Sequence, residues 1–360
     1  MANETAVKST ASSVLENVVT PIENNTGGFV VDVSANIWRY GWPPLCTMGL
    51  VGNTLVLLVL RRDGLVRTSA NVYLSALAVG DSLLLMVASV VVYPGLGWGW
   101  WFDDASRLVF RVTRPVLFTL GSASTWFIVA FTVERCVVVR APLRRLSTPR
   151  NAGLCCGSLL LLAFVKNIDL FFVQDNVVYT DSGDVTCTAP LRYRDYMNNY
   201  RRMINFVTCG VIPIVIVIVC NWAIIRTLRR ELVQTTARDS IVRHTTVMCL
   251  AVSFEFVVCV FPAHVFYVTI PNWPMPQQDQ FDILQCLLLL RYTNHAVNFF
   301  LYSLTGAHFR CELVALFRSF IQRGRVTAGV VRRVTSRVTD MVHYRRELDH
   351  HFEMYLNEHC

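Results

Sequence analysis

Charged residues are scarce in this chain, and the short motifs typical of enzymes are missing. Only 16% of its 360 residues are charged and 53% are hydrophobic, a balance that argues against a soluble domain. No cluster of cysteine and histidine has the spacing of a metal site, and no glycine-rich loop suggests bound phosphate. No nucleophile–base pair stands out either, so we do not expect an enzyme.

An internal repeat and an apolar leader are also missing. The lack of a repeat disfavours a transporter built from two related halves. Residues 1–20 are polar, so we expect no cleavable signal peptide and expect the first apolar stretch to insert the chain. Most of the 12 cysteines lie within apolar stretches, where cysteine packs as a small hydrophobe, so a disulfide framework is not expected.

The sequence does contain seven long apolar stretches separated by short polar loops. Each has roughly 20 residues or more, enough for a helix to cross a hydrocarbon layer about 30 Å thick. Backbone that crosses lipid must satisfy its own hydrogen bonds, which favours helices. The stretches begin near Tyr40, Ala70, Arg107, Ala152, Met203, Thr245 and Ile283.

These stretches predict an all-α integral membrane protein, a seven-transmembrane-helix bundle. We expect an extracellular N-terminal tail over 1–39, the membrane domain over 40–305 and a cytoplasmic tail over 321–360. Residues 306–320 are predicted to form a short amphipathic juxtamembrane helix, because apolar residues such as Phe309 and Leu313 recur on one helical face.

Arginine is distributed unevenly between the two ends of the spans. It is concentrated in the loops after the first, third and fifth spans and in the C-terminal tail. The positive-inside rule therefore predicts a multi-pass plasma-membrane protein with an extracellular N-terminus and a cytoplasmic C-terminus. Asn3 and Asn24 begin N-glycosylation triplets in the predicted extracellular tail. Because the basic residues flank spans, they indicate contact with anionic membrane lipids and not with nucleic acid.

Polar and proline residues follow a set order along the spans. The groups are Gly52-Asn53, Leu77-Ala78-Val79-Gly80-Asp81, Glu134-Arg135-Cys136 followed by Ala141-Pro142-Leu143, Pro213, Phe256 with Cys259-Val260-Phe261-Pro262, and Asn294 with Asn298-Phe299-Phe300-Leu301-Tyr302. Over residues 40–320 this order resembles the rhodopsin-like class A of G-protein-coupled receptors. The end of the seventh span is most similar to invertebrate FMRFamide-type neuropeptide receptors and related orphan receptors.

The resemblance implies a sodium and water pocket around Asp81. A charge near the centre of a bilayer is costly unless it is paired or hydrated, so Asp81 should face the bundle interior. In the family's pattern Asp81 would be the Na⁺ ligand; a purely structural hydrogen-bond cluster is the alternative. No other cofactor is expected. The matching pocket residues are Asn53, Asp81, Ser124, Asn294 and Asn298.

The resemblance also implies a switch at the inner ends of the helices. Glu134 would hold Arg135 at rest, and Arg135 would meet a G protein in the active state. The switch residues are Glu134, Arg135, Leu143, Pro262, Asn298 and Tyr302. Pro262 would kink the sixth helix and let its inner end swing outward. Val242 and Arg243 stand where the family often has an acidic partner, so we expect a weak resting lock and basal activity.

Several positions depart from the family's pattern, among them the fourth span, which lacks its usual tryptophan, and Cys136, which replaces the usual tyrosine. Phe110 stands where the family has a cysteine bonded to the second extracellular loop, so Cys187 lacks its expected disulfide partner. Val260 replaces the toggle tryptophan of the sixth span, and Phe299 replaces the proline of the seventh. These replacements fall on residues that the family uses in ligand-driven switching, and they leave the expected fold unchanged.

The outer ends of the spans are rich in arginine, which suits a ligand with a carboxylate. An acidic peptide or a free C-terminus would fit; pairing of these arginines with loop aspartates or lipid head groups is the alternative. Leu117 stands where amine receptors hold an aspartate, which disfavours an aminergic function. The candidate ligand contacts are Arg114, Leu117, Phe118, Arg202, Asn205, His264, Tyr267, Arg291 and Tyr292.

Three further charged residues lie inside predicted spans. Lys166 and Asp169 are three residues apart, and we expect them to pair on one helical face. Glu255 is expected either to be neutral or to bond a neighbouring helix.

The sequence therefore predicts a receptor that transmits an extracellular signal, carried by a neuropeptide, to a heterotrimeric G protein. Arrestin and a receptor kinase are expected as further partners. A small-molecule chemosensor and a basally active orphan receptor remain as alternatives, and a transporter or channel is the alternative from a different class.

Overall fold

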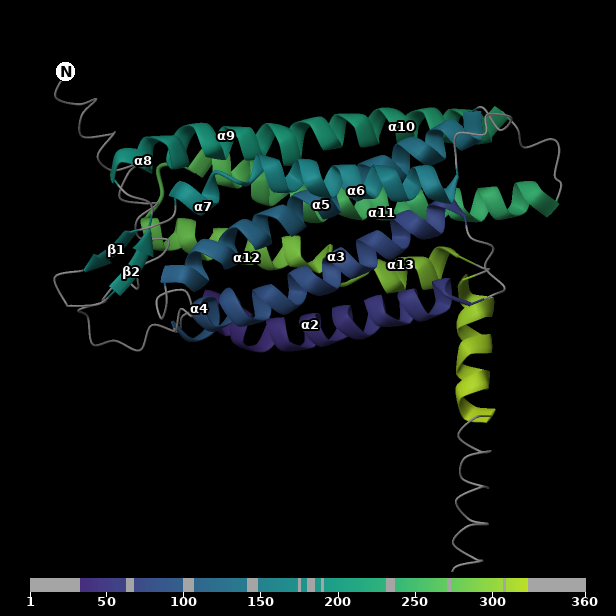
Figure 1. The fold of residues 1–360 in the computed structure, drawn as a ribbon, viewed down its shortest axis with the longest axis horizontal. Helices are drawn as coiled ribbons and strands as arrows, with labels where there is room; N and C mark the ends of the chain where they lie inside the picture. The colour runs from purple at the N-terminus through teal and green to yellow at the C-terminus, as the bar shows by residue number, and fades with distance from the viewer. Residues whose placement is uncertain are drawn as a thin grey trace, which may run out of the picture. The chain divides into compact units, whose positions relative to one another are not determined.

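The computed structural model describes residues 33–62, 68–99, 107–140, 148–173, 176–179, 185–188, 191–230, 237–270, 273–306 and 309–322. The chain divides into two compact units, Met1–Arg310 and Cys311–Cys360. In the first unit the helices of the predicted spans lie side by side (Figure 1). Six described helical segments are long and apolar enough to cross a membrane, and the seventh span is a helix broken into two pieces. The predicted all-α seven-helix bundle is confirmed.

The first four spans consist of long helices with short extensions. They are α2 (Val33–Leu60), α3 (Ser69–Val91) with α4 (Tyr93–Trp98), α5 (Arg107–Arg140), and α6 (Pro149–Lys166) with α7 (Leu170–Val173). Two of these helices have a threonine N-cap: the hydroxyls of Thr68 and Thr148 accept hydrogen bonds from the backbone N–H of Asn71 and Asn151, each over 3.2 Å. Such caps satisfy backbone donors that the first turn leaves unpaired.

A short antiparallel hairpin adds two strands to the predicted all-α fold. Strand β1 (Asn176–Tyr179) pairs with β2 (Val185–Thr188), and Val177 lies opposite Cys187. The hairpin lies at the same end of the bundle as α4, α7 and α8 (Leu191–Asp195) (Figure 1). The side chain of Cys187 lies outside the described residues, as does that of Phe110.

The last three spans each contain an irregularity or a proline. The fifth comprises η2 (Tyr196–Arg201), α9 (Arg202–Asn205), η3 (Phe206–Val211) and α10 (Ile212–Arg230), so two π-helical segments interrupt it. The sixth is α11 (Ala237–Thr269), which contains Pro262. The seventh consists of α12 (Gln277–Thr293) and α13 (Asn298–Thr305), separated by turn residues 294–297.

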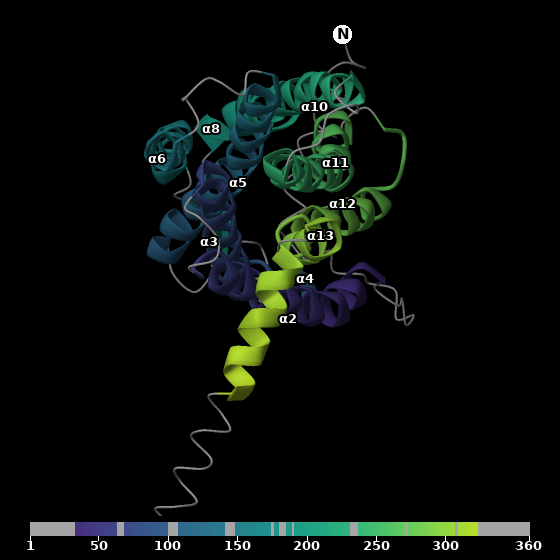
Figure 2. The same ribbon diagram turned by 90° about the vertical axis from the view of Figure 1, so that its right-hand side faces the viewer.

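Helix α5 is the central helix of the bundle. It packs against α3, α6, α10 and α11, whereas α6 lies at the periphery (Figure 2). Because α5 has a neighbour on most sides, its polar residues can meet side chains from several spans. This arrangement brings the predicted site residues of the second, third and seventh spans into one interior region.

The first helix begins at Val33, seven residues earlier than the predicted membrane boundary at Tyr40. The early start has a packing cause, because Trp38 and Trp42 stack with ring centroids 5.4 Å apart and both are buried. Trp42 Nε1 donates to Ser89 Oγ over 3.1 Å, and Tyr292 packs edge-on against both tryptophans. These aromatic contacts secure the first turns of α2 against the second and seventh spans.

The helix that follows the seventh span covers residues 309–322, close to the predicted 306–320. In the first unit, Phe309 packs edge-on against Tyr302 with ring centroids 6.0 Å apart. In the second unit, Leu316 is buried, whereas Phe317 and Phe320 are exposed. Exposed aromatic residues on a helix with a basic face are typical of a helix that lies on a membrane surface. Residues 323–360 lie outside the described part.

Candidate functional site

Asp81 lies at the centre of the bundle with no exposed surface. Its Oδ1 accepts hydrogen bonds from Ser124 Oγ over 2.8 Å and from His295 Nδ1 over 2.6 Å. Its Oδ2 accepts one from Asn298 Nδ2 over 2.9 Å. The carboxylate therefore has donors from α5, from the break in the seventh span and from α13, which offsets the cost of burying it.

The break between α12 and α13 exposes two consecutive polar residues to the interior. Asn294 Nδ2 donates to Glu255 Oε2 of α11 over 2.5 Å. The backbone carbonyl of His295 accepts from Asn53 Nδ2 of α2 over 3.1 Å. Of the predicted pocket residues, Ser124 and Asn298 contact Asp81 directly, whereas Asn53 and Asn294 reach the same cluster through other partners. Glu255 bonds a neighbouring helix, which was one of its two expected roles.

The residues around Asp81 do not fit a sodium ion. A small hard cation binds through several oxygen atoms, but a ring N–H of His295 contacts the carboxylate, and both carboxylate oxygens already accept hydrogen bonds. Two amide oxygens of the same cluster, Asn53 Oδ1 and Asn298 Oδ1, are buried without a hydrogen-bond partner, but the ring N–H of His295 already occupies Asp81 Oδ1. The alternative reading, a hydrogen-bond cluster, agrees better with this geometry.

At the inner end of α5, Glu134 and Arg135 form an ion pair. Arg135 Nε and Nη2 both donate to Glu134 Oε2, over 2.9 and 2.5 Å. Ser69 Oγ of α3 donates to the other carboxylate oxygen of Glu134. The Arg135 guanidinium also lies 5.8 Å from the ring centroid of Phe131. Arg135 is thus buried in a fixed position, held by its neighbour in sequence.

The sixth helix is connected to α5 at the same depth. Thr132 Oγ1 and Ser253 Oγ lie 3.1 Å apart and share a hydrogen bond. Phe256 is fully buried one turn further out, before Pro262. Tyr302 is buried at the inner end of α13. Leu143 lies outside the described residues, as do the side chains of Val242 and Arg243, so the resting lock at the sixth span stays a prediction.

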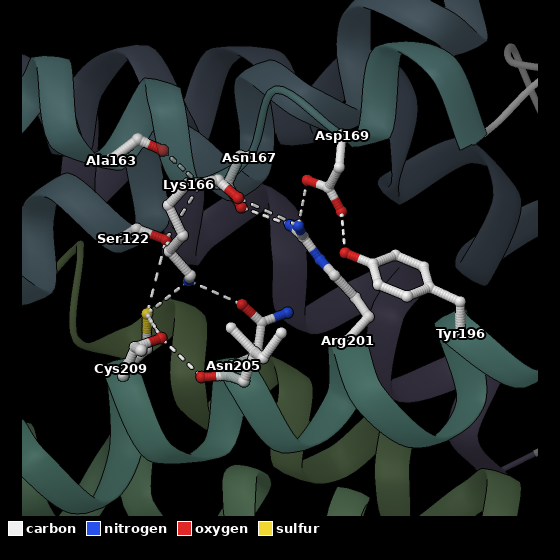
Figure 3. Close-up of polar contacts among 11 residues, drawn as sticks. Ser122, Ala163, Lys166, Asn167, Asp169, Tyr196, Arg201, Asn205 and Cys209 are labelled. Carbon is white, nitrogen blue, oxygen red and sulfur yellow. Dashed lines mark hydrogen bonds and ion pairs between the residues drawn. The ribbon is translucent and has the colours of Figure 1, made fainter.

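A polar cluster joins the outer halves of the third, fourth and fifth spans (Figure 3). Lys166 Nζ donates to Asn205 Oδ1 over 2.7 Å, to Ser122 Oγ over 3.2 Å and to Cys209 Sγ over 3.1 Å. Because its three donors are occupied, Lys166 needs no carboxylate. Asn205, predicted as a ligand contact, serves instead as an acceptor for this lysine.

The predicted pair of Lys166 and Asp169 is wrong. Asp169 instead contacts Arg201 of η2, and Tyr196 Oη donates to its Oδ2 over 2.9 Å (Figure 3). Arg201 Nη2 also donates to Asn167 Oδ1. Helix α6 ends at Lys166 and residues 167–169 form a turn before α7, so a three-residue spacing no longer places two side chains on one face.

Two arginines near this cluster lack an anionic partner among the described residues. Arg202 is 9% exposed, and its Nε and Nη1 are buried with no hydrogen-bond partner. Its guanidinium lies 5.9 Å from the ring centroid of Tyr267. Arg291 Nη2 approaches α5 at Gly121, where an added Cβ would lie 3.3 Å from it.

The remaining predicted ligand contacts have mixed surroundings. Tyr292 and Leu117 pack against the cluster around Trp38 and Trp42, and Phe118 lies 5.7 Å from the Arg201 guanidinium. His264 Nδ1 donates to its own helix at Val260 O over 3.0 Å. Arg114 lies on α5 and is half-buried. Among the predicted ligand contacts that the structure describes, Arg202 and Arg291 are therefore cations without a carboxylate partner.

Sequence reasoning missed three residues that the geometry makes important: Ser69, Asn167 and His295. His295 could have been noticed in the sequence, because it forms a polar pair with Asn294 inside an apolar stretch. The other two gave no signal, because serine and asparagine near helix ends usually serve as caps.

Comparison with known families matches residues 52–302 to the family described as 7 transmembrane receptor (rhodopsin family). The match covers more than half of the chain and runs from α2 to α13, so it includes the Asp81 cluster, the Glu134–Arg135 pair and the outer arginines. The chain therefore belongs to the rhodopsin family of seven-transmembrane receptors, which are not enzymes and pass signals from extracellular ligands to heterotrimeric G proteins.

Proposed function

We propose that this receptor responds to an extracellular peptide that presents a carboxylate, as an acidic side chain or a free C-terminus. The observation that carries the proposal is the pair Arg202 and Arg291, two cations inside the outer bundle with no anionic partner in the described residues. A planar guanidinium binds a carboxylate through two parallel hydrogen bonds. A ligand anion would supply the partner that the receptor itself does not.

The neighbouring cations do not offer the same opportunity. Lys166 has three neutral acceptors, and Arg201 is engaged by Asp169 and Asn167. Arg201 Nε is buried without a hydrogen-bond partner, but the Asp169 carboxylate balances the charge of its guanidinium, so Arg201 needs no ligand anion. Arg202 and Arg291 are the members whose charge remains available to a ligand.

This charge distribution bears on the resemblance to FMRFamide-type receptors. A peptide that ends in an amidated Arg-Phe carries a cation and no terminal carboxylate. It would meet like charges at Arg202 and Arg291, which is unfavourable in a region of low dielectric constant. Asp175, Asp181 and Asp184 could receive such a cation only from the loop, and they lie outside the described residues.

Ligand binding would reach the G protein through α11. This helix carries His264 and Tyr267 beside the outer arginines, Glu255 and Ser253 in its middle, and Pro262 between them. A ligand that contacts the outer part of α11 would favour a different bend of this helix at Pro262. The inner part of α11 would then swing outward. Arg135 would then leave Glu134 and meet the G protein.

The test is G-protein dissociation by energy transfer in cells, with surface expression matched between variants. One pool of synthetic neuropeptides with free C-terminal carboxylates is compared with the same sequences as C-terminal amides. We expect the free acids to activate and Arg135→Ala to abolish the response. We expect Arg202→Ala and Arg291→Ala to raise the half-maximal concentration by roughly tenfold or more, as for loss of a buried charged hydrogen bond.

Arg192→Ala is the matched control, because Arg192 is an exposed arginine on α8 that stacks on Tyr193. It removes the same charge from the same end of the bundle without touching Arg202 or Arg291, and it should leave the response unchanged. Equal activation by the amidated pool, or equal weakening by Arg192→Ala, would contradict the proposal.

A small carboxylic acid is the second candidate ligand. Arg291 Nη2 lies next to α5, where a Cβ added at Gly121 would be 3.3 Å away, and one guanidinium can bind a single carboxylate without a peptide around it. A panel of small carboxylic acids in the same assay separates the two candidates: activation by the panel that requires Arg291, without activation by the peptide pool, would identify a chemosensor.

The distribution of charged residues predicts the membrane orientation of the receptor and the partners on each side. We place it in the plasma membrane with the N-terminus outside, where Asn3 and Asn24 can carry glycans. The basic inner face and tail would meet anionic lipids, the G protein, arrestin and a receptor kinase. Signalling without ligand remains an alternative, and the same assay measures it in untreated cells.

A further inference from the structure

His295 lies beside Asp81, where its ring N–H can take the place of a bound cation. Its Nδ1 lies 2.6 Å from Asp81 Oδ1 and 3.4 Å from Ser124 Oγ. Its side chain is 6% exposed and that of Asp81 is fully buried. A carboxylate can only accept hydrogen bonds, so the imidazole nitrogen that faces Asp81 is a donor.

The local backbone explains why the ring reaches Asp81. Residues 294–297 form a turn between α12 and α13, so His295 leaves the helical path of the seventh span. Asn53 Nδ2 of α2 donates to the His295 carbonyl, and Asn298 Nδ2 donates to Asp81 Oδ2. Two contacts therefore fix His295: Asn53 of α2 holds its backbone carbonyl, and Asp81 of α3 holds its ring.

We propose that His295 replaces the sodium ion at Asp81, so that the receptor binds no sodium there and joins α3 to the seventh span by a permanent side-chain contact. Three donors satisfy the two carboxylate oxygens, and the imidazole fills the space on the Oδ1 side next to Ser124. An ion would have to displace a side chain that is tethered to the same pocket and always present at high effective concentration.

For signalling, the contact between α3 and the seventh span must break when the seventh span moves. With an ion, the contact between α3 and the seventh span depends on the concentration of sodium outside the cell. With His295, it depends only on the folded chain, because the donor and the acceptor belong to the same protein. The stability of the receptor should therefore not depend on which monovalent cation is present.

The test is thermal unfolding of the purified receptor in detergent, in NaCl and in KCl at equal ionic strength. This measurement needs neither ligand nor G protein, so it is independent of the proposed function. Four proteins are compared: wild type, His295→Ser, the double variant His295→Ser with Asp81→Asn, and His264→Ser. The last removes a partly buried histidine from α11 and controls for loss of an imidazole elsewhere.

We expect the unfolding temperature of wild type and His264→Ser to be equal in the two salts. His295→Ser offers a hydroxyl and space beside Asp81, so NaCl should raise its unfolding temperature over KCl by roughly 2–4 °C in a saturable way. The added Asp81→Asn should abolish that difference. If His295→Ser does not fold, His295→Asn, which also supplies an oxygen, takes its place.

Two results would overturn the inference. A saturable, sodium-specific rise in the unfolding temperature of wild type would show that an ion binds despite His295. Equal unfolding temperatures in both salts for wild type and for both His295 variants would show that His295 is not the reason for the absence of sodium binding.

Discussion

At the scale of single residues, three carboxylates inside the described bundle, those of Asp81, Glu134 and Glu255, each have a donor from another span or from a neighbour in sequence. Asp81 accepts from Ser124, His295 and Asn298, and Glu255 accepts from Asn294. Glu134 accepts from Arg135 and from Ser69 of α3. Because an unpaired charge is so costly in a membrane, these contacts determine which helix positions are compatible with one another. When the receptor changes state, a charged side chain that loses one hydrogen-bond partner must therefore gain another.

Ser69 offers a direct test of the resting pair. Ser69→Ala removes one donor to Glu134, so the carboxylate loses part of the support that orients it toward Arg135, and Arg135 should leave it more readily. We expect ligand-free G-protein dissociation to rise by roughly two- to tenfold, equivalent to about 0.5–1.5 kcal/mol. Glu134→Gln should raise it further.

The control for this prediction is Ser82→Ala on the same helix. Ser82 Oγ donates to Ala78 O of its own helix over 2.7 Å, so its loss removes a hydroxyl without touching Glu134. An unchanged basal signal in Ser69→Ala, at equal surface expression, would mean that the Ser69 contact does not hold the resting state.

The residue patterns predicted some contacts of the site and missed others for a geometric reason. Asp81 was expected to face the interior beside Ser124 and Asn298, and both donate to it. The interior position of Asp81 followed from the cost of a charge within a span, whereas its neighbours Ser124 and Asn298 were implied by the resemblance to the receptor family. His295 was missed, because its ring reaches Asp81 only where the helix breaks at residues 294–297. Helical periodicity contains no information about such a break.

At the scale of elements, interruptions of the helices place the polar side chains. The turn at residues 167–169 separates Lys166 from Asp169 and gives each a partner on the fifth span. The π-helical segments η2 and η3 flank α9, which carries Arg202 and Asn205. Such irregular turns often occur at functional sites. The sequence predicted the spans correctly but not the interruptions, so the Lys166–Asp169 pair was wrong.

Asp169→Asn tests the connection between the fourth and fifth spans. The substitution leaves Arg201, which is 4% exposed, without its carboxylate. Breaking a buried ion pair costs about 3–5 kcal/mol, and the partial exposure of Asp169 reduces this to roughly 1–3 kcal/mol. We expect the unfolding temperature of the purified receptor to fall by roughly 2–10 °C.

Asp195→Asn is the comparison for that measurement. Asp195 is exposed and accepts a hydrogen bond from Asn199 over 2.5 Å, so the same chemical change at the surface should shift the unfolding temperature by less than about 2 °C. If the two variants unfold at the same temperature, the contact between Asp169 and Arg201 does not stabilise the fold.

Glu255→Ala tests how the sixth helix is held against the seventh. The Glu255–Asn294 hydrogen bond joins α11 to the break in the seventh span. Loss of this bond in Glu255→Ala should let α11 move outward more easily, so ligand-free G-protein dissociation should rise. Glu255→Gln keeps an acceptor for Asn294, so this variant should resemble wild type. Equal basal signals in the alanine and glutamine variants would show that this bond does not restrain α11.

At the scale of the whole molecule, the class of protein was predictable because it depends on features summed over many residues. Seven apolar stretches and an ordered set of polar residues predicted the fold and the family. The proposed ligand class depends instead on which cations lack a carboxylate partner. Lys166, Arg201, Arg202 and Arg291 look alike in sequence, and only the contacts of the folded chain show that Lys166 has three acceptors and that Arg201 has a carboxylate partner.

Orientation is the remaining whole-molecule prediction. The arginines that follow the first, third and fifth spans and fill the C-terminal tail favour the cytoplasmic side, since moving them across the bilayer is costly. We expect an N-terminal epitope to be stained on intact cells and a C-terminal epitope to be stained only after permeabilisation. We also expect Asn24→Gln to increase electrophoretic mobility to the extent of one glycan, as glycosidase treatment of wild type would. A C-terminal epitope accessible on intact cells would reverse the orientation, and it would move Arg135 and the basic tail away from the compartment that contains the G protein.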